Sequence, residues 1–494
     1  MANPSEPSAQ VQRVLFAASE IDPLVKVGGL GDVAGSLPQA IQALDPASFQ
    51  GTSFDIRVVV PLHTPIRETV SQSEPVVSFW IPRAGGSQFV QVYQIELNGV
   101  QVYLVDGQPI SAAKGIYDPD PEVDGEKYTF FSLAALELGH QLGWRPDVIH
   151  ANDWHTALIP YLLELKKPYD HFFAGCRSVL TIHNLPFMGA HSEDALEAYG
   201  VPRSTEPKLP LWARYLPLPL GLQSSDAVIA VSPTYAQEIL TPEFGHGLQD
   251  LLLSRRESVS GILNGLDTLH WDPQNDQGIP AAFSYQNLDA RQANKKALLE
   301  SLSLEYIRQV PLLIFIGRMD QQKGVDLAIE ALRSLRQVRW QAIFLGTGNP
   351  QLEDACRKLE KDYPKQVRAI TRFDGALARN MYAGADLLLM PSRYEPCGLA
   401  QMIAMRYGCI PLARATGGLR DTIHDRLNSN KNTGFLFEKP SASDMAKTIQ
   451  RALKQFADDL QWMPMQVRGM LQDFSWQNSA AQYANVYLSH KEQT

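Results

Sequence analysis

The chain has 494 residues, of which 45% are hydrophobic and 20% charged, a composition typical of a soluble globular protein with more than one domain. This excludes a peptide, a lone binding module and a wholly disordered chain. Lys and Arg total 44 against 53 Asp and Glu, and the formal net charge of -9 argues against nucleic-acid binding through phosphates. The four cysteines form no CxxC pair, and no signal peptide or membrane span is predicted, so we expect a cytoplasmic protein with reduced thiols.

Two series of short apolar runs alternate with helical periodicity along the chain. The first series lies at residues 14–18, 56–60, 146–150, 178–182 and 227–231, and the second at 312–316, 342–345, 385–390 and 409–413. Such alternation predicts parallel sheets covered by helices, here two doubly wound α/β domains. Residues 91–105 are an exception, because Asn98-Gly99 between two alternating segments predicts a hairpin. Turn residues over 261–290 indicate an interdomain connection, and ligands are expected in a cleft at the carboxyl ends of the strands.

A glycine-rich loop follows the first predicted strand. It reads Lys26-Val27-Gly28-Gly29-Leu30-Gly31-Asp32, and glycines before a helix allow a phosphate to approach the free N–H groups, with Lys26 adding a charge. The loop also fits the dinucleotide pattern GxGxxA. However, the glycines lie about nine residues beyond the strand, and no acidic residue ends a second strand at the expected place, which argues against NAD. The alternative is a plain glycine-rich turn.

Two histidine-bearing loops follow the next strands of the first domain. His150-Ala151-Asn152-Asp153-Trp154-His155 and Thr181-Ile182-His183-Asn184 should project polar side chains into the cleft, where they would bind a hydroxyl-rich ligand. Helix capping is the alternative. A zinc site from His150, Asp153 and His155 fits no common ligand spacing, so no metal is predicted. Residues 118–120, which match the metal-binding DxD pattern, are predicted to form a turn.

Three loops of the second domain carry charge or glycine. Arg318 and Lys323, each beside a glycine, are predicted to neutralise a diphosphate, with a solvated surface pair as the alternative. Glu395 is predicted to lie at a helix start where backbone N–H groups hold it ionised. The segment Thr416-Gly417-Gly418 resembles a second phosphate-binding loop at a helix N-terminus.

These motifs resemble, in order, those of bacterial glycogen synthases and plant starch synthases. The segments are KVGGLGDV at 26, HANDWHT at 150, TIHN at 181, GILNGLD at 261, GRMDQQKG at 317, SRYEPCGL at 392 and TGGLRDT at 416. The resemblance implies the GT-B fold, two Rossmann-like domains facing across a cleft. It also implies retaining transfer of glucose from ADP-glucose to the non-reducing 4-hydroxyl of an α-1,4-glucan, without a metal or other cofactor.

The resemblance further implies domain bounds. They are an acceptor domain over 11–262, a connection over 263–290, a nucleotide-sugar-binding domain over 291–474, and a C-terminal helix over 475–494 that crosses back to the first domain.

The resemblance assigns roles to matching residues. His183, Arg318, Lys323, Glu395 and Asp153 match catalytic-region positions, with Arg318 and Lys323 on the diphosphate and Glu395 on sugar hydroxyls. The matching substrate-binding positions are Lys26, Gly28, Gly29, Asp32, His155, Asn264, Cys397, Gly398, Thr416, Gly417 and Gly418.

Departures from the family pattern fall at Asn152 and at Pro186-Phe187-Met188, which border the acceptor side. Acceptor preference is therefore less firmly implied than reaction type.

Four other functions are compatible with parts of the sequence. They are a GT-B transferase that uses UDP-glucose or another donor, a glucan phosphorylase with lysine-bound pyridoxal phosphate, a non-catalytic glucan-binding protein, and an NAD-linked oxidoreductase. The expected partners are ADP-glucose and a maltooligosaccharide or glucan, with no nucleic acid and no membrane. The sequence carries no signal for a particular oligomeric state.

Overall fold

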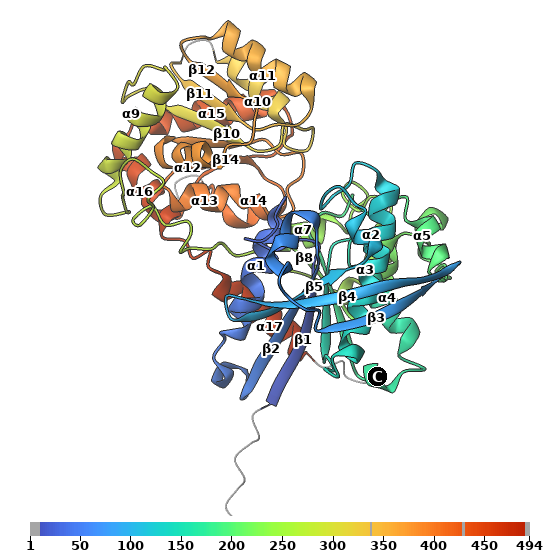
Figure 1. Cartoon of the computed structure of the whole chain (residues 1–494). Coiled ribbons are helices and arrows are strands. Elements are labelled where there is room, and N and C mark those ends of the chain that lie inside the picture. The colour runs from blue at the N-terminus through green and yellow to red at the C-terminus, as the bar shows by residue number, and fades with distance from the viewer. Residues whose placement is uncertain (1–9, 336–337, 427–429, 490–494) are drawn as a thin grey trace, which may run out of the picture. The chain divides into compact units, whose positions relative to one another are not determined.

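A computed structural model describes residues 10–335, 338–426 and 430–489 (Figure 1). The chain divides into two compact units: unit 1 comprises residues 1–265 and 476–494, and unit 2 comprises residues 266–475. The chain first crosses from unit 1 to unit 2 after residue 265, near the start of the connection predicted over 263–290. Residues 266–290 therefore belong to unit 2. The C-terminal helix belongs to unit 1.

Unit 1 contains a nine-stranded sheet in the order β3-β4-β5-β2-β1-β6-β7-β8-β9. Its strands are β1 (Gln10–Ala17), β2 (Thr52–Pro61), β3 (Val77–Arg83), β4 (Gly86–Leu97), β5 (Val100–Asp106), β6 (Val148–Asn152), β7 (Arg177–Ile182), β8 (Ala227–Ala230) and β9 (Val259–Gly261). The pairs β3–β4 and β4–β5 are antiparallel and the others are parallel. The predicted hairpin is confirmed, because Asn98 and Gly99, between β4 and β5, have φ of 51° and 78°.

Helices lie on both faces of this sheet. They are α1 (Gly29–Gln42), α2 (Gln108–Ser111), α3 (Pro121–Gln141), α4 (Leu158–Lys166), α5 (Glu193–Ala198), α6 (Pro217–Ser224), α7 (Pro233–Glu238), α8 (Gln249–Ser254) and α17 (Trp476–Leu488). Five short 3-10 helices join them: η1 (Pro46–Phe49), η2 (Thr64–Val70), η3 (His171–Phe173), η4 (Leu211–Ala213) and η5 (Arg256–Ser258).

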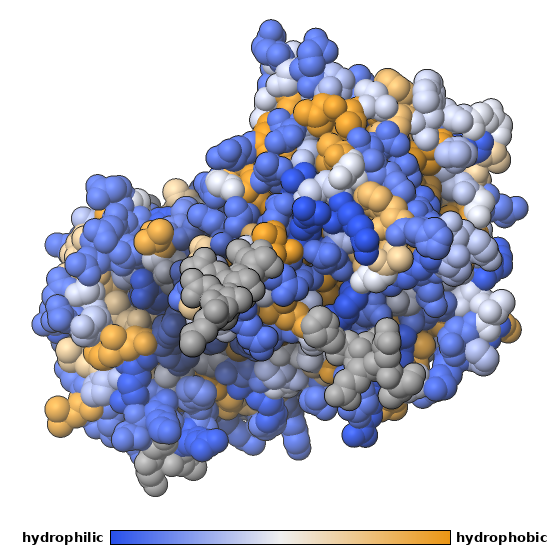
Figure 2. All heavy atoms as spheres, turned by 90° about the horizontal axis from the view of Figure 1, so that it is seen from below, coloured by the Kyte–Doolittle hydropathy of each residue, from blue (hydrophilic) through white to orange (hydrophobic). Residues whose placement is uncertain are grey.

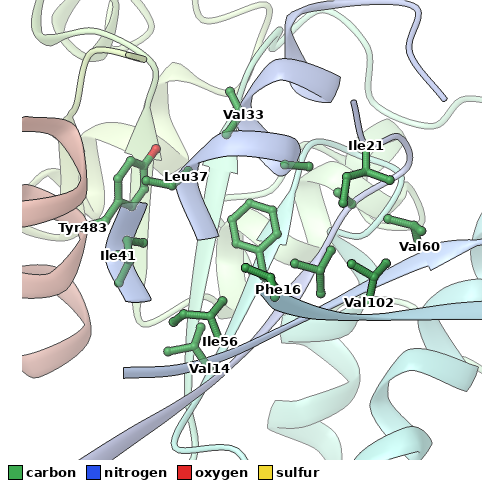
Figure 3. Packing of buried hydrophobic residues seen from close by; sticks show 14 of the residues in the cluster. Val14, Phe16, Ile21, Val33, Leu37, Ile41, Ile56, Val60, Val102 and Tyr483 are labelled. Atoms are coloured by element: carbon green, nitrogen blue, oxygen red, sulfur yellow. The ribbon is translucent and has the colours of Figure 1, made fainter. Parts of the chain in front are cut away.

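Side chains along β1 point alternately to the two faces of the sheet, and both faces are buried. Val14 and Phe16 pack with α1 and α17 on one face, whereas Leu15 and Ala17 belong to a second core with α3 and α4 on the other. Figure 3 shows the first core, in which Tyr483 of the C-terminal helix lies beside residues of α1. The last helix of the chain thus completes the core of the first domain.

Unit 2 contains a six-stranded parallel sheet in the order β12-β11-β10-β13-β14-β15. Its strands are β10 (Leu312–Ile316), β11 (Gln341–Leu345), β12 (Val367–Ile370), β13 (Leu387–Met390), β14 (Ile410–Arg414) and β15 (Phe435–Phe437). Its helices are η6 (Leu288–Ala290), α9 (Arg291–Ser301), α10 (Val325–Ser334), α11 (Pro350–Asp362), α12 (Gly375–Gly384), α13 (Ala400–Arg406), α14 (Gly417–Thr422), α15 (Ala442–Phe456) and α16 (Asp459–Met470). The predicted class, two doubly wound α/β domains, is confirmed.

The surface in the view of Figure 2 is mostly hydrophilic, with hydrophobic side chains in scattered groups. Among the described residues, no helix has the length and apolarity needed to span a membrane.

Candidate active site

Polar residues follow five strands of unit 1 at the carboxyl edge of the sheet. Asp153 follows β6 and His183 follows β7, as predicted, and Asn264 follows β9, a strand that was not predicted. The structure adds Glu20 after β1 and His63 after β2, whose Nε2 lies 2.8 Å from the Ser19 carbonyl oxygen. Applying the strand-end rule to every predicted strand would have found both, since their two strands were predicted.

Glu20 organises the glycine-rich loop. One oxygen of its buried carboxylate accepts hydrogen bonds from the backbone N–H groups of Val27 and Gly28, and the other accepts one from the Tyr117 hydroxyl at 3.1 Å. Burial raises the pKa of Glu20, although these hydrogen bonds oppose the shift. Within the predicted phosphate loop, the N–H groups of Val27 and Gly28, which precede α1, are therefore held by a carboxylate of the protein itself.

Lys26 and Asp32 from this loop pair with each other. Lys26 Nζ lies 2.6 Å from Asp32 Oδ1 and 3.6 Å from Asp22 Oδ2. Burial alone would lower the pKa of Lys26, but the two carboxylates outweigh it and the pKa lies above its usual value. Asp32 is in the first turn of α1, and Gly29 is the first residue of that helix. The loop therefore presents a lysine that remains charged at neutral pH.

Asp153 fixes the backbone of the second histidine loop. It adopts a left-handed conformation with φ of 54°, and its Oδ1 accepts hydrogen bonds from the N–H groups of His183 at 2.7 Å and Asn184 at 3.1 Å. Burial raises the pKa of Asp153 to about 7, against the two hydrogen bonds that lower it. Asp153 thus orients the loop and can exist in either protonation state near neutral pH.

Three histidines of this region are held neutral. Burial lowers the pKa of His183 to about 3 and that of His63 to about 4, and lowers the pKa of His155 well below its usual value. His183 Nε2 lies 3.0 Å from Asn152 Oδ1, and the His155 ring packs against Tyr117 with centroids 5.0 Å apart. These rings therefore offer neutral hydrogen-bonding groups, which suit hydroxyls better than phosphates.

Several buried polar atoms near these strand ends have no hydrogen-bond partner among the described residues. They are Nδ1 of His63, Nδ1 of His155, Oδ1 of Asn184 and Oδ1 of Asn264. A buried polar group without a partner costs about 1–3 kcal/mol, so such atoms indicate ligand contacts. A ligand with several hydroxyls, each of which can donate and accept, would satisfy them.

His150, one of the two histidines in the zinc set that the sequence spacing argued against, belongs to the core. Its ring nitrogens lie 2.7 Å from the Thr181 hydroxyl on β7 and 2.7 Å from the Tyr487 hydroxyl on α17. Within the described part of the chain, no three His, Cys, Asp or Glu side chains are arranged to hold a metal ion. Residues 118–120 form the predicted turn, since Asp118 Oδ1 accepts from Asp120 N and Asp120 caps α3.

In unit 2, the cations predicted to bind a diphosphate follow β10. The Arg318 side chain is 58% exposed and lies 3.0 Å from Asp320, so it extends into solvent. Lys323 Nζ lies 2.8 and 2.7 Å from the two oxygens of Glu395, whose side chain is 6% exposed. The pair brings together two residues that sequence reasoning had assigned to separate loops.

The interpretation of Glu395 as a residue at a helix start is wrong. The next helix, α13, begins at Ala400, and the Glu395 carboxylate is held by Lys323 and by the Ser392 hydroxyl at 2.9 Å. Side chains, and not the backbone of a helix terminus, bind this carboxylate. Ser392 was missed because its role depends on the course of the loop, which has no sequence signal.

The glycines before α14 allow two loops to meet. A Cβ on Gly417 would lie 2.0 Å from the Glu395 carbonyl oxygen, and one on Gly418 would lie 2.1 Å from that of Cys397. The N–H of Gly418 donates to Glu395 O and Pro396 O, both at 3.2 Å. Thr416 and Cys397 are buried, and Gly398 has φ of 75°. These glycines therefore hold the backbone that carries Glu395, a packing role additional to the predicted phosphate contact.

Comparisons with known proteins identify the family of the chain. Residues 13–254 match the family described as "Starch synthase catalytic domain", and residues 306–462 match "Glycosyl transferases group 1". A glycogen synthase of Anaeromyxobacter sp. is 39% identical over 491 residues, covering 96% of this chain and 99% of its own. One from Lactiplantibacillus plantarum is also 39% identical, with coverage of 96% and 98%.

Two solved structures are similar to this chain over nearly its whole length. The catalytic domain of starch synthase IV from Arabidopsis thaliana, bound to ADP and acarbose, is 31% identical with a TM-score of 0.83, covering 97% of this chain and 99% of that domain. The sucrose-phosphate synthase of Thermosynechococcus elongatus is 19% identical with a TM-score of 0.59 and shares the fold, with coverage of 96% and 98%. The fold is GT-B, and the chain belongs to the glycogen synthase and starch synthase family of glycosyltransferases.

Proposed function

We propose that the chain elongates an α-1,4-glucan by transferring glucose from ADP-glucose to the non-reducing 4-hydroxyl, with retention of configuration and without a metal. The observation that carries the proposal is that the chain offers two kinds of binding group. Unit 1 offers neutral, partly unsatisfied hydrogen-bonding groups around Asp153 and His183 together with the charged Lys26, and unit 2 offers the cations Arg318 and Lys323. Neutral groups of this kind suit sugar hydroxyls and the cations suit a diphosphate, the two parts of a sugar nucleotide.

In the proposed mechanism, the departing ADP needs stabilisation of its negative charge and also accepts the proton of the acceptor hydroxyl. As the bond between glucose C1 and the diphosphate oxygen breaks, negative charge accumulates on ADP, and Arg318 and Lys323 stabilise it. The acceptor 4-hydroxyl forms its bond to C1 on the same face, and its proton passes to the departing phosphate oxygen. No strong protein base is then needed. This is consistent with a His183 ring whose pKa, lowered to about 3, keeps it neutral.

Glu395 and Asp153 have positioning roles in this scheme. Glu395, bound by Lys323 and Ser392, would accept hydrogen bonds from glucose hydroxyls and fix the ring beside the cations. Asp153 holds the His183 and Asn184 backbone, so the His183 carbonyl and ring keep a fixed place beside the sugar. Lys26, on the glycine-rich loop, adds a further charge for the diphosphate.

The test is a side-by-side assay of donors. Purified protein is incubated with ADP-glucose or UDP-glucose and maltotriose, with EDTA present, while nucleoside diphosphate release and chain length are followed and the new linkage is assigned by NMR. We expect ADP release matched by α-1,4 elongation. Faster use of UDP-glucose would overturn the assignment of ADP-glucose as the donor. Loss of turnover in EDTA would overturn the proposal that no metal is needed, and a new β-linkage would overturn retention of configuration.

A non-catalytic glucan-binding protein is the second candidate, favoured only by the neutral hydrogen-bonding groups of unit 1. It predicts glucan binding without nucleotide release. The variant Arg318→Ala separates the two, because only an enzyme loses turnover when this exposed cation is removed. Lys296→Ala, on the surface of α9, is the matched control.

A further inference from the structure

A buried ion pair on α3 contacts the loop of residues 112–120, which joins α2 to α3 in unit 1. Lys127 Nζ lies 2.6 Å from Asp124 Oδ1, and the two side chains are 0% and 9% exposed. The mechanism described above uses neither residue. An ion pair buried in this way adds little net stability, because the desolvation of both charges offsets their attraction. The pair therefore calls for a role other than stability.

The pair holds the backbone of this loop. Besides its bond to Asp124, Lys127 Nζ donates to the carbonyl oxygens of Gly115 at 3.1 Å and Ile116 at 2.7 Å. Asp124 Oδ1 in turn accepts a hydrogen bond from the N–H of Asp118 at 3.0 Å. The three bonds of Lys127 use all three N–H donors of its ammonium group, so none is left for a substrate.

Tyr117, at the centre of the held segment, links the loop to the candidate active site. Residues 116 and 118, on either side of it, are both bonded to the ion pair. The Tyr117 hydroxyl donates to Glu20 Oε1 at 3.1 Å, and the other oxygen of Glu20 accepts from two N–H groups of the glycine-rich loop. Contacts thus run without interruption from the ion pair to that loop.

We propose that Lys127 and Asp124 are positioning residues for the glucosyl transfer. By fixing the backbone on both sides of Tyr117, they keep Glu20 in the orientation that holds the glycine-rich loop, and so keep Lys26 in place for the diphosphate. The inference rests on the proposed function, which gives Lys26 that role. A misplacement of about 1 Å costs about 10² in rate even when the mutation is far from the chemistry, so an indirect hold of this kind is enough to matter.

The test variant is Lys127→Met/Asp124→Asn, which removes both charges and leaves no unpaired charge buried. The matched control is Lys295→Met/Asp386→Asn in unit 2. In that pair Nζ and Oδ2 are 2.7 Å apart, the side chains are 1% and 5% exposed, and Nζ also donates to a backbone carbonyl. Asp386 lies just before β13, at the amino edge of its sheet, whereas the candidate site residues of unit 2 follow the strands.

The first readout is hydrogen exchange of the free proteins, measured by mass spectrometry. We expect faster exchange in the test variant in peptides that cover 112–119 and 21–31, and unchanged exchange in both peptides of the control. Faster exchange in 112–119 alone would overturn the link to the glycine-rich loop. Unchanged exchange in both peptides of the test variant, or the same increase in the control, would overturn the specific hold of the pair on the loop.

The second readout is kcat with ADP-glucose and maltotriose, at a temperature well below all thermal midpoints. It should fall by about 10–10²-fold in the test variant and stay within about twofold in the control. Tyr117→Phe removes the bond to Glu20, and adding it to the test variant should lower kcat by less than about threefold more, because residues that act through one contact are not additive. An unchanged kcat in the test variant, or losses that simply multiply, would overturn the positioning role.

Tyr128→Phe keeps the test possible if the test variant does not fold. The Tyr128 hydroxyl donates to the carbonyl oxygen of Ile116, so its removal loosens the same loop without touching a charge, and the same exchange pattern and the same coupling to Tyr117→Phe are expected.

Failure of the proposed function is separate from failure of this inference. A wild type that uses neither sugar nucleotide would remove the synthase and with it the reaction that the pair serves, whereas the exchange link through Glu20 would stand. Elongation by the wild type with multiplicative losses in the variants would leave the synthase and remove the positioning role.

Discussion

Replacing Lys323 with alanine tests whether its ion pair with Glu395 is structural, catalytic or both. Lys323→Ala leaves a carboxylate that is 6% exposed with the Ser392 hydroxyl as its remaining side-chain partner among the described residues. Breaking a buried pair in this way costs about 3–5 kcal/mol. Because the Lys323 side chain is 24% exposed and Ser392 still binds the carboxylate, we expect the free energy of unfolding to fall by a smaller amount, about 2–3 kcal/mol. At about 2–4 °C per kcal/mol, the melting temperature should fall by about 4–12 °C.

The double variant Lys323→Ala/Glu395→Gln separates stability from catalysis. It removes the unpaired charge, so most of the lost stability should return, measured by urea unfolding. Activity should not return: loss of a charge that stabilises the leaving group costs about 10²–10³ in kcat. Lys296→Ala, which breaks a surface pair with an N–O distance of 3.8 Å, should change stability by less than about 0.5 kcal/mol.

Two results would refute this reasoning. A double variant no more stable than Lys323→Ala would mean that the buried charge of Glu395 is not what the lysine compensates. Recovery of activity in the double variant would mean that Lys323 acts only by neutralising Glu395 and does not act on the diphosphate.

Four further changes have defined outcomes. Arg318→Ala should lower kcat by about 10²–10³ with an unchanged melting temperature, because the side chain is 58% exposed; an unchanged kcat would remove its role. Tyr487→Phe removes the hydroxyl 2.7 Å from His150 and should cost about 1–3 kcal/mol in urea unfolding, without a change in KM. Burial lowers the pKa of His150 to about 3, so its neutral ring contributes stability above about pH 6.5 that is lost as pH falls; His150→Gln should make the unfolding free energy depend less steeply on pH between about 4 and 6. Burial raises the pKa of Asp153 to about 7, so the wild type should lose stability relative to Asp153→Asn as pH rises from about 4 to 7, and a difference independent of pH would contradict the shift.

Much of the fold could be predicted from the sequence because buried parallel strands are continuous apolar runs. The predicted strands at 312–316 and 178–182 lie within a residue of β10 and β7. The strands β3, β9, β12 and β15 were not predicted. β9 (Val-Ser-Gly) and β12 (Val-Arg-Ala-Ile) lack the continuous apolar run by which the similarly short β8 and β13 were found.

The site could be predicted in outline once the strands were located. Ligands of such sheets bind at the carboxyl ends of the strands, so the polar residues that follow each predicted strand were the candidates. This rule could not show how they pair. His150 meets Tyr487 from 337 residues away, and Lys323 meets Glu395 from 72 residues away, so sequence spacing carried no sign of either contact. Without those contacts, His150 was expected to project into the cleft and Glu395 was expected to lie at a helix start.

The place of α17 has a consequence for the order in which the protein can mature during translation. Unit 1 begins at the start of the chain, but Tyr483 and Tyr487 in its core lie near the end, after all of unit 2. N-terminal domains usually fold first, at about 5–20 residues per second of synthesis. Here the apolar face of α1 and the ring of His150 stay uncovered on the ribosome until the last helix emerges. The apolar face of the first domain that α17 covers is thus completed only after the second domain has been synthesised.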